Sequence, residues 1–337
     1  MALPAHEILL HRDLVGHAVH VGQVDRPNRF LPQLRKRHTF DYNLAIDGCR
    51  RILWGMFTKM CIADNLAVIT DAVWNDYSSQ GGSTLFLVAM LYLIQMYADF
   101  DGYSNMAIGV GKILGFRVAP NFNHPLLARN IADYWRRWHM SLTSWITDYV
   151  LTPLNLAFRN FGKSGLVIAV MVNLIVIGFW HGANWTYGLF GFYHGLLIVP
   201  LVFSGSFGKS KKIKPTRYGL PGINDLLKMI GTFCLVSIGL IIFRAPSVSD
   251  AFSYISGIFS MSFFSLPSKT ISAIGNITFL FILLLIVLEW ITREQEYPIQ
   301  NLGLKWSRPI RFAMYYVIIF AIIYFGGKEQ QFIYFQF

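Results

Sequence analysis

Charged side chains are scarce in this chain. Lys, Arg, Asp and Glu make up 14% of its 337 residues, whereas soluble domains carry about 25%. A water-soluble fold of this size could not cover its surface with so few charges, which excludes an ordinary soluble enzyme and a disordered chain. Hydrophobic residues reach 54% and the mean hydropathy is +0.44. The composition therefore predicts an all-α, polytopic transmembrane protein.

Cysteine is also rare. Cys49, Cys61 and Cys234 stand far apart in apolar surroundings. This spacing excludes a disulfide scaffold and gives no metal or redox motif, so we interpret them as small hydrophobic residues and expect no metal site. The first 20 residues lack the charged region and apolar core of a signal peptide.

Acidic residues are outnumbered by basic ones, 18 against 29, which gives a net charge of +11. In so apolar a chain this excess favours cytoplasmic loops rich in Lys and Arg over nucleic acid binding. The basic residues concentrate in 117–163, 204–225 and 292–309, whereas 245–270 holds one lysine. We therefore expect the first three segments in the cytoplasm, and 245–270 and His181–Asn184 towards the outer side.

Membrane spans need about 20 mostly apolar residues. Candidate spans are Thr84–Tyr97 with a continuation through Gly109–Phe116, Ser164–Trp180, Trp185–Phe203, Leu226–Phe243, Ile271–Ile291 and the shorter Ile310–Phe325. A seventh stretch, Ile52–Trp74, contains Lys59, Asp64 and Asp71, and fits either a broken span or an interfacial helix. Arg117–Lys163 is too polar to span and rich in Trp. It predicts one or two interfacial or re-entrant helices, the second ending at Pro153.

Histidines and acids at membrane depth are the candidates for chemistry. His181 lies between two predicted spans in Gly178–Trp185, where it fits either a functional role or a hydrogen bond that holds helix packing. His194 favours a structural role, and His139 fits an interfacial anchor helix. Asp99 and Asp101 fit hydrogen bonding at a helix break, or an ion or substrate path. A neutral imidazole in a dry cavity could remove the proton of an alcohol that attacks an activated acyl group.

Several motifs together resemble the bacterial membrane-bound O-acyltransferase family. They are Tyr97–Ser104 (YADFDGYS), Asn121–Pro125 (NFNHP), Ala128–Leu142 (ARNIADYWRRWHMSL), Trp180–Ala183 (WHGA) and Phe332–Phe337 (FIYFQF), the last similar to the end of the alginate O-acetylase branch. The resemblance covers 29–337, which we assign as one transmembrane domain after a divergent segment 1–28. It implies helices around a central cavity.

The resemblance also implies a function. A family member of this branch moves an acyl group, here expected to be acetyl, to hydroxyls of an extracytoplasmic polysaccharide or its carrier. The donor would be acetyl-CoA or another acyl thioester used as a co-substrate, with no bound cofactor. A secreted SGNH-like acetyltransferase would be the partner, and the bacterial inner membrane the location. The family's histidines correspond to His181 and His139, which we predict as catalytic. Substrate-binding residues by the same comparison are Asp99, Asp101, Asn121, Arg136 and Trp180.

The chain departs from the family pattern in two places. The helices and the Gly-Pro-Ile stretch expected before Phe30–Leu34 are absent, so we expect an N-terminally truncated family member. Thr147 stands before Asp148 where many relatives have Arg. Two other functions stay open: a non-catalytic export or scaffolding subunit of a polysaccharide-modification complex, and an ion-coupled transporter using Asp99 and Asp101.

Overall fold

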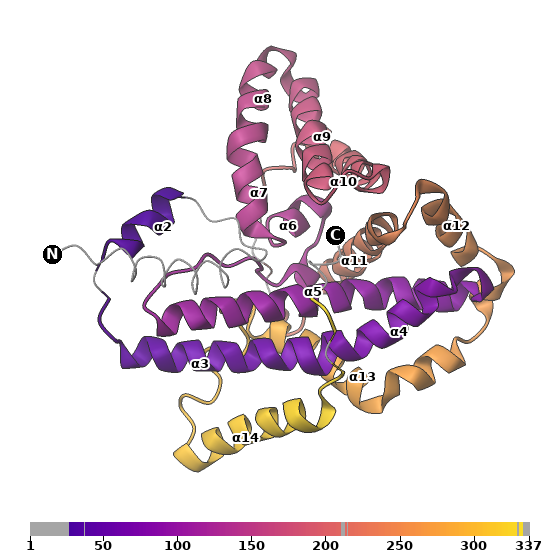
Figure 1. Cartoon of the computed structure of the whole chain (residues 1–337). Helices are drawn as coiled ribbons and strands as arrows, with labels where there is room; N and C mark the ends of the chain where they lie inside the picture. The colour runs from indigo at the N-terminus through magenta and orange to yellow at the C-terminus, as the bar shows by residue number, and fades with distance from the viewer. Residues whose placement is uncertain (1–26, 37, 210–212, 214, 329, 333–337) are drawn as a thin grey trace. The chain divides into compact units, whose positions relative to one another are not determined.

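The structure, a computed structural model, describes residues 27–36, 38–209, 213, 215–328 and 330–332. Within this described part all regular elements are helices and there is no strand, as the composition predicts (Figure 1). The segment 1–28 lies outside the described residues except for its last two positions. The structure therefore does not test the interpretation of the first 20 residues.

The helices follow one another along the whole described chain. In order they are α2 (Pro27–Leu34), α3 (Tyr42–Met56), α4 (Asp64–Asn75), α5 (Gly82–Ile113), α6 (Ile131–Trp135), α7 (Met140–Ile146), α8 (Thr152–Ala157), α9 (Gly162–Trp180), α10 (Trp185–Phe203), α11 (Ile223–Arg244), α12 (Val248–Ile258), α13 (Ser268–Ile291) and α14 (Arg308–Phe325). Two π-helical segments, η1 (Phe57–Ala63) and η4 (Thr147–Leu151), join α3 to α4 and α7 to α8. Short 3₁₀ turns are η2 (Tyr77–Ser79), η3 (Pro125–Leu127), η5 (Arg159–Phe161) and η6 (Met261–Phe264).

Seven helical segments of the described chain are long and apolar enough to cross a membrane. They are Tyr42–Asn75, Gly82–Ile113, Arg159–Trp180, Trp185–Phe203, Ile223–Arg244, Lys269–Ile291 and Arg308–Phe325. The six predicted spans are all among them, which confirms a multi-pass membrane protein. The ambiguous stretch Ile52–Trp74 is part of a 34-residue helical segment that continues through the π-helical turn η1, so it too has the length of a span.

Two compact units make up the fold. The first comprises the described residues of 27–66, 95–123 and 276–332, and the second those of 67–94 and 124–275. Helices α4 and α5 contribute residues to both units, and α13 changes unit at Gly275, where a left-handed φ of 70° interrupts the helix.

Glycines bring α3 and α5 into close contact in the first unit. A Cβ atom on Gly55 would lie 2.4 Å from the carbonyl oxygen of Gly102, and one on Gly48 would lie 2.6 Å from that of Gly109. The pairs are seven residues apart on each helix, about two turns, so both contacts fall on one face. Such small-residue seams let membrane helices approach closely enough for extensive van der Waals packing.

The second unit is built on the α9–α10 hairpin. Gly178 and Gly191 again permit close packing, since a Cβ on either would lie within 2.2 Å of a carbonyl oxygen of the other helix. The turn between the helices is closed by Asn184, whose Oδ1 accepts a hydrogen bond from the Thr186 N–H at 3.1 Å. Its Nδ2 donates to the Pro246 carbonyl at 3.1 Å, which ties the turn to the segment after α11.

The polar stretch 117–163 forms several short helices, in agreement with its predicted helical character. The prediction that Pro153 ends a helix is wrong. The π-helical turn η4 changes the hydrogen-bond pattern just before it, which places Pro153 in the first turn of α8. There its missing N–H would have no partner within the helix in any case.

Of the two interpretations of Asp99 and Asp101, hydrogen bonding at a helix break does not hold. Helix α5 continues without interruption from Gly82 to Ile113. The polar side chains are accommodated by partners rather than by a break, as described below.

Candidate functional site

Local capping fixes the segment that carries His139. Asn130 begins α6, and its Oδ1 accepts a hydrogen bond from the Asp133 N–H at 2.8 Å. Asp133 is buried; its Oδ2 accepts from the Arg129 N–H at 3.3 Å, and its Oδ1 pairs with Arg137 Nε at 3.2 Å. One carboxylate therefore holds both ends of the short helix that precedes His139.

His139 has an uncommon backbone conformation. Its φ of 44° and ψ of 51° lie in the left-handed region, which residues other than glycine rarely adopt. It occupies the N-cap of α7, and its carbonyl accepts from the Thr143 N–H at 2.9 Å. The residue is 2% exposed. Non-glycine residues in this conformation concentrate at functional sites, where surrounding packing maintains the strain.

His181 caps the other end of the site, at the C-terminus of α9. Its N–H donates to the Gly178 carbonyl at 3.0 Å, which closes the last turn of the helix. The imidazole packs against Phe243 with 4.9 Å between ring centroids. His181 is partly exposed, and the preceding Trp180 is 42% exposed, so solvent reaches this end of α9 in the chain itself.

Trp180 contacts both histidines. Its ring centroid lies 5.8 Å from that of His139 and 5.1 Å from that of His181, with each pair of rings nearly perpendicular. The structure thus brings His139 together with Trp180 and His181, which follow it by about 40 positions in the sequence. All three were predicted as site residues, and they come from the α6–α7 segment and the α9–α10 turn.

Desolvation sets the charge state of the two histidines. Desolvation, together with the repulsion that a second imidazolium charge on the nearby His181 would cause, lowers the pKa of His139 to about 3. Desolvation also lowers the pKa of His181 to about 4. Both imidazoles are therefore neutral near pH 7, the form that can accept a proton.

Arg136 borders a cavity of about 100 Å³ in the same unit. Its Nη1 donates to the Phe207 carbonyl at 3.0 Å, and its side chain is 38% exposed. The cavity is lined by Ala132, Trp135, Arg136, Thr143, Thr147, Leu151, Val170, Asn173, Leu174, Ile177, Ile198 and Phe207. Arg136 therefore lies three residues from His139 in the chain but belongs to the wall of a separate space.

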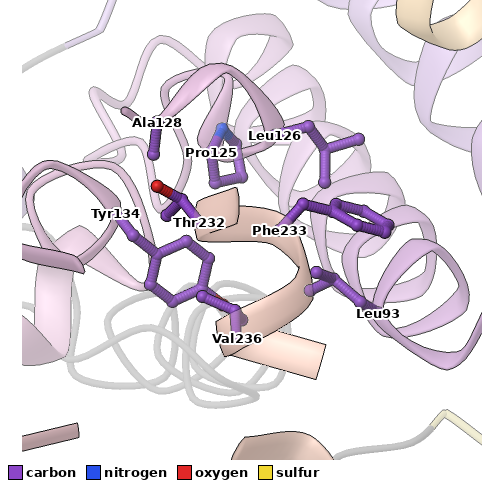
Figure 2. Close-up of a pocket in the computed structure, with 8 residues that line it drawn as sticks. All are labelled: Leu93, Pro125, Leu126, Ala128, Tyr134, Thr232, Phe233 and Val236. Carbon is purple, nitrogen blue, oxygen red and sulfur yellow. The ribbon is translucent and has the colours of Figure 1, made fainter. Parts of the chain in front are cut away.

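A second cavity in this unit is about 10 Å³, close to the size of one water molecule. Figure 2 shows the rings of Tyr134 and Phe233 lying among Leu93, Pro125 and Val236 around it. The hydroxyl of Thr232 donates to the Lys228 carbonyl at 2.7 Å. This space is a packing void and is too small for a substrate.

Asp99, Asp101 and Asn121 belong to the first unit. Asp99 forms an ion pair with Lys59 at 2.6 Å, and Lys59 also reaches Asp64 at 2.6 Å. Asp101 accepts from Asn105 Nδ2 at 2.8 Å. Asn121 is 1% exposed, and its Nδ2 donates to Ser104 Oγ at 3.2 Å. These contacts account for the buried polar groups by mutual pairing, and their predicted substrate role stays a prediction.

Two residues that organise these regions were missed from the sequence. Lys59 was seen only as a charge that weakens a predicted span, although it forms ion pairs with both Asp64 and Asp99. Asp133 was noted only as polar, yet the Asn130-x-x-Asp133 spacing is a recognisable helix-start signal. Among the described residues, no group of three His, Cys, Asp or Glu side chains could hold a metal ion.

Comparisons with known proteins identify the family of this chain. Residues 42–236, more than half of the chain, match the model of the MBOAT, membrane-bound O-acyltransferase family. This chain belongs to the membrane-bound O-acyltransferase family. The matched range contains His139, Trp180 and His181 and ends within α11.

Three relatives illustrate the range of this family. The probable alginate O-acetylase AlgI of Azotobacter vinelandii is 35% identical over 71% of this chain and 45% of its own length. The peptidoglycan O-acetyltransferase of Helicobacter pylori is 27% identical over 94% of this chain and 62% of its own. The teichoic acid D-alanyltransferase of Bacillus subtilis is 30% identical over 72% and 62%. The chain spans about half the length of the alginate O-acetylases it matches.

Proposed function

We propose that this chain carries the acyl-transfer centre of a membrane O-acyltransferase, with an extracytoplasmic polysaccharide or its carrier as acceptor. The observation that carries the proposal is the pair of neutral imidazoles, His139 and His181, packed on one indole with His181 partly exposed. The relatives' names support the class of reaction, because they describe acylation of alginate, peptidoglycan and teichoic acid.

In this proposal His181 is the general base. Its neutral ring takes the proton of the acceptor hydroxyl while the hydroxyl oxygen attacks the carbonyl carbon of an acyl thioester. The carbon–sulfur bond then breaks, and the imidazolium returns the proton to the leaving thiolate. The low pKa of the resting ring favours neutrality before the reaction, and negative charge developing on the carbonyl oxygen would stabilise the imidazolium during it.

His139 has a different role in the proposal. It is almost fully buried, so it cannot reach bulk solvent, and its position is fixed by the left-handed N-cap of α7. We assign it to the donor side, where it lines the route of the thioester or orients its carbonyl. Trp180 fixes the positions of both imidazole rings, because it packs against each of them.

The remaining identities rest on the family resemblance. We propose acetyl-CoA or another acyl thioester as donor from the cytoplasm, and a secreted SGNH-like acetyltransferase as partner. The bacterial inner membrane is the proposed location. The relatives named above come from bacteria, which supports this location.

A scaffolding subunit without chemistry is the competing function. The purified protein in detergent separates the two when it is given acetyl-CoA and an alginate or glycan acceptor. An enzyme releases free thiol faster than the protein-free control, and this release is lost in His181→Gln. No release with any acceptor, from protein that keeps a cooperative thermal transition, would favour the scaffold.

A further inference from the structure

Helix α12 lies between two membrane spans in a segment with few charges. It follows α11 and precedes α13 in the chain, and both neighbours have the length and hydropathy of a span. Residues 245–270 contain two charged side chains, Asp250 and Lys269. The segment therefore starts and ends near a membrane surface, which the distribution of Lys and Arg predicts to be the outer one.

One face of α12 packs against its own unit. Ala251, Tyr254 and Ile258 are buried, and at about 100° per residue they fall within an arc of about 60°. The ring of Tyr254 stacks on Trp74 with 4.3 Å between centroids, and its hydroxyl donates to the Leu85 carbonyl at 3.0 Å. These contacts hold the helix against the end of α4 and the start of α5.

A second face of α12 is apolar but exposed. Phe252 and Phe259 are 59% and 79% exposed, and they lie within about 20° of each other around the helix. Ile255 lies on the same face at intermediate exposure. The apolar arc of the helix thus continues for about 100° beyond the buried face, over side chains that the described chain leaves exposed.

The third face of α12 is polar. Ser249, Ser253 and Ser256 are exposed and occupy the arc next to the two phenylalanines. Further round, Asp250 Oδ1 accepts a hydrogen bond from the Tyr77 hydroxyl at 2.8 Å. A helix with one side on the protein, one apolar face and one polar face can lie in the plane of a membrane interface, between lipid and water.

The turn after α12 continues the exposed apolar surface. Three of its side chains are between 86% and 89% exposed: Met261, Phe264 and Leu266. The backbone that carries them is anchored, because Ser262 Oγ accepts from the Gly82 N–H at 2.8 Å. The ring of Phe263 also packs edge-on against Phe86, with 5.7 Å between centroids. The exposed apolar side chains therefore belong to a turn that the protein holds in place.

We propose that α12 and η6 form a lipid-binding surface that inserts into the boundary between headgroups and acyl chains. Phe252, Phe259 and Phe264 enter the lipid, and the serine face of α12 stays in water. Aromatic side chains are favoured at this depth. The occupant is lipid and not a protein partner, because the chain enters the bilayer at both ends of this segment. The apolar side chains also continue to Ile271 in α13, which is 53% exposed.

This surface is connected to the turn beside His181. Asn184 Nδ2 donates to the Pro246 carbonyl just before α12, so insertion of α12 fixes the end of α9 relative to the bilayer. The lipid contact itself does not need the imidazole. It should persist in His181→Gln, so it can be tested separately from the proposed acyl transfer.

Spin labels on single cysteines test the insertion in the full chain. The three native cysteines are replaced by alanine, and labels are placed on Phe252→Cys, Phe259→Cys or Phe264→Cys in lipid nanodiscs. We expect these labels to lie about 5–10 Å deep and to collide with oxygen more often than with a water-soluble nickel chelate. Ser249→Cys and Ser253→Cys, on the polar face of the same helix, are the matched controls and should show the reverse preference. Preference of all five labels for the chelate, or shielding of all five from both reagents, would overturn the proposal.

Photo-crosslinking keeps the test decisive if the cysteine-free chain folds poorly. Benzoylphenylalanine replaces Phe264 in the chain with its native cysteines, and cell membranes are irradiated. We expect adducts with phospholipid in the wild-type and His181→Gln backgrounds, and loss of these adducts when the same probe replaces Ser253. Adducts with another protein in place of phospholipid, or equal lipid adducts from the two positions, would overturn the proposal.

Discussion

The imidazole of His139 and the indole of Trp180 lie almost at right angles, with 5.8 Å between their ring centroids. Trp180 directly precedes His181 and contacts its ring as well. The side chain between the two histidines therefore links the α6–α7 segment to the end of α9. Changes at Trp180 should affect both imidazoles at once.

Replacing Trp180 tests this link. Trp180→Ala removes the surface against which both rings pack, and should lower acyl transfer by about tenfold or more, since each aromatic contact is worth about 0.5–1.5 kcal/mol. Trp180→Phe keeps a flat ring and should retain most of the activity. Trp185→Phe is the control, because Trp185 is 78% exposed. Equal activity of Trp180→Ala and wild type would show that Trp180 does not position the histidines.

The pH dependence follows from the lowered histidine pKa values. An imidazole with a pKa of about 4 is already neutral at pH 6.5, so protonation of His181 should not reduce kcat/KM between pH 8 and about 5.5. Unfolded histidines titrate near 6.5 and therefore bind protons that the folded state does not. The stability from His139 and His181 is complete above about 6.5 and declines as the pH falls from there towards the folded values.

Two measurements check these expectations. Initial rates of the wild type across the pH range should show no inflection near 6.5. Thermal melts in detergent should show a smaller loss of stability between pH 6.5 and 5 for His139→Gln than for wild type. An inflection near 6.5 assigned to His181 would contradict an imidazole that desolvation keeps neutral.

Variants of the Lys59 ion pairs can distinguish a structural role of Asp99 from a role in substrate binding. Lys59→Met would leave Asp64 and Asp99 as buried carboxylates without their cation, and should destabilise the protein by about 3–5 kcal/mol. The triple variant Lys59→Met, Asp64→Asn, Asp99→Asn removes all three charges and should recover most of that stability. The melting temperature in detergent measures both changes.

Activity of the triple variant then decides the role of Asp99. If the carboxylate binds substrate, KM should rise even though the fold is restored. If its function is to pair with Lys59, activity should return together with stability. A triple variant less stable than Lys59→Met would contradict the ion-pair account itself.

The glycine seam between α3 and α5 should tolerate no side chain. Gly102→Ala would place a Cβ atom 2.8 Å from the Gly55 carbonyl oxygen, and should cost about 1–3 kcal/mol. Gly231→Ala on α11 is the matched control: it has open space within 4 Å, and alanine favours the helix. Thermal unfolding of the two variants compares them. Equal stability of the two variants would show that α3 and α5 can move apart without a loss of folding free energy.

Much of this fold was predictable from the sequence because membrane spans depend on local composition. The six apolar stretches and His181 at a span end are visible without any long-range information. The contacts that satisfy the polar groups are not. Asp99 pairs with Lys59, 40 residues earlier, and no local pattern connects them. The alternative of a helix break at Asp99 and Asp101 does not hold for this reason, since paired polar groups do not require one.

The π-helical turns could not be predicted from the sequence either. Pro153 normally indicates a helix end, but η4 rearranges the hydrogen bonds before it so that the helical path continues. The grouping of His139 with His181 was anticipated only through family resemblance. Their contact depends on Trp180 and on the left-handed backbone of His139, neither of which periodicity predicts.

The most direct measurement is O-acetyl content of the exported polysaccharide in cells that express wild-type protein or His181→Gln at matched membrane levels. His38→Gln, a histidine outside the site that packs on Phe116, serves as the control. The account predicts acetylation at background with His181→Gln and normal acetylation with His38→Gln. Normal acetylation with His181→Gln would contradict the claim that this imidazole activates the acceptor hydroxyl.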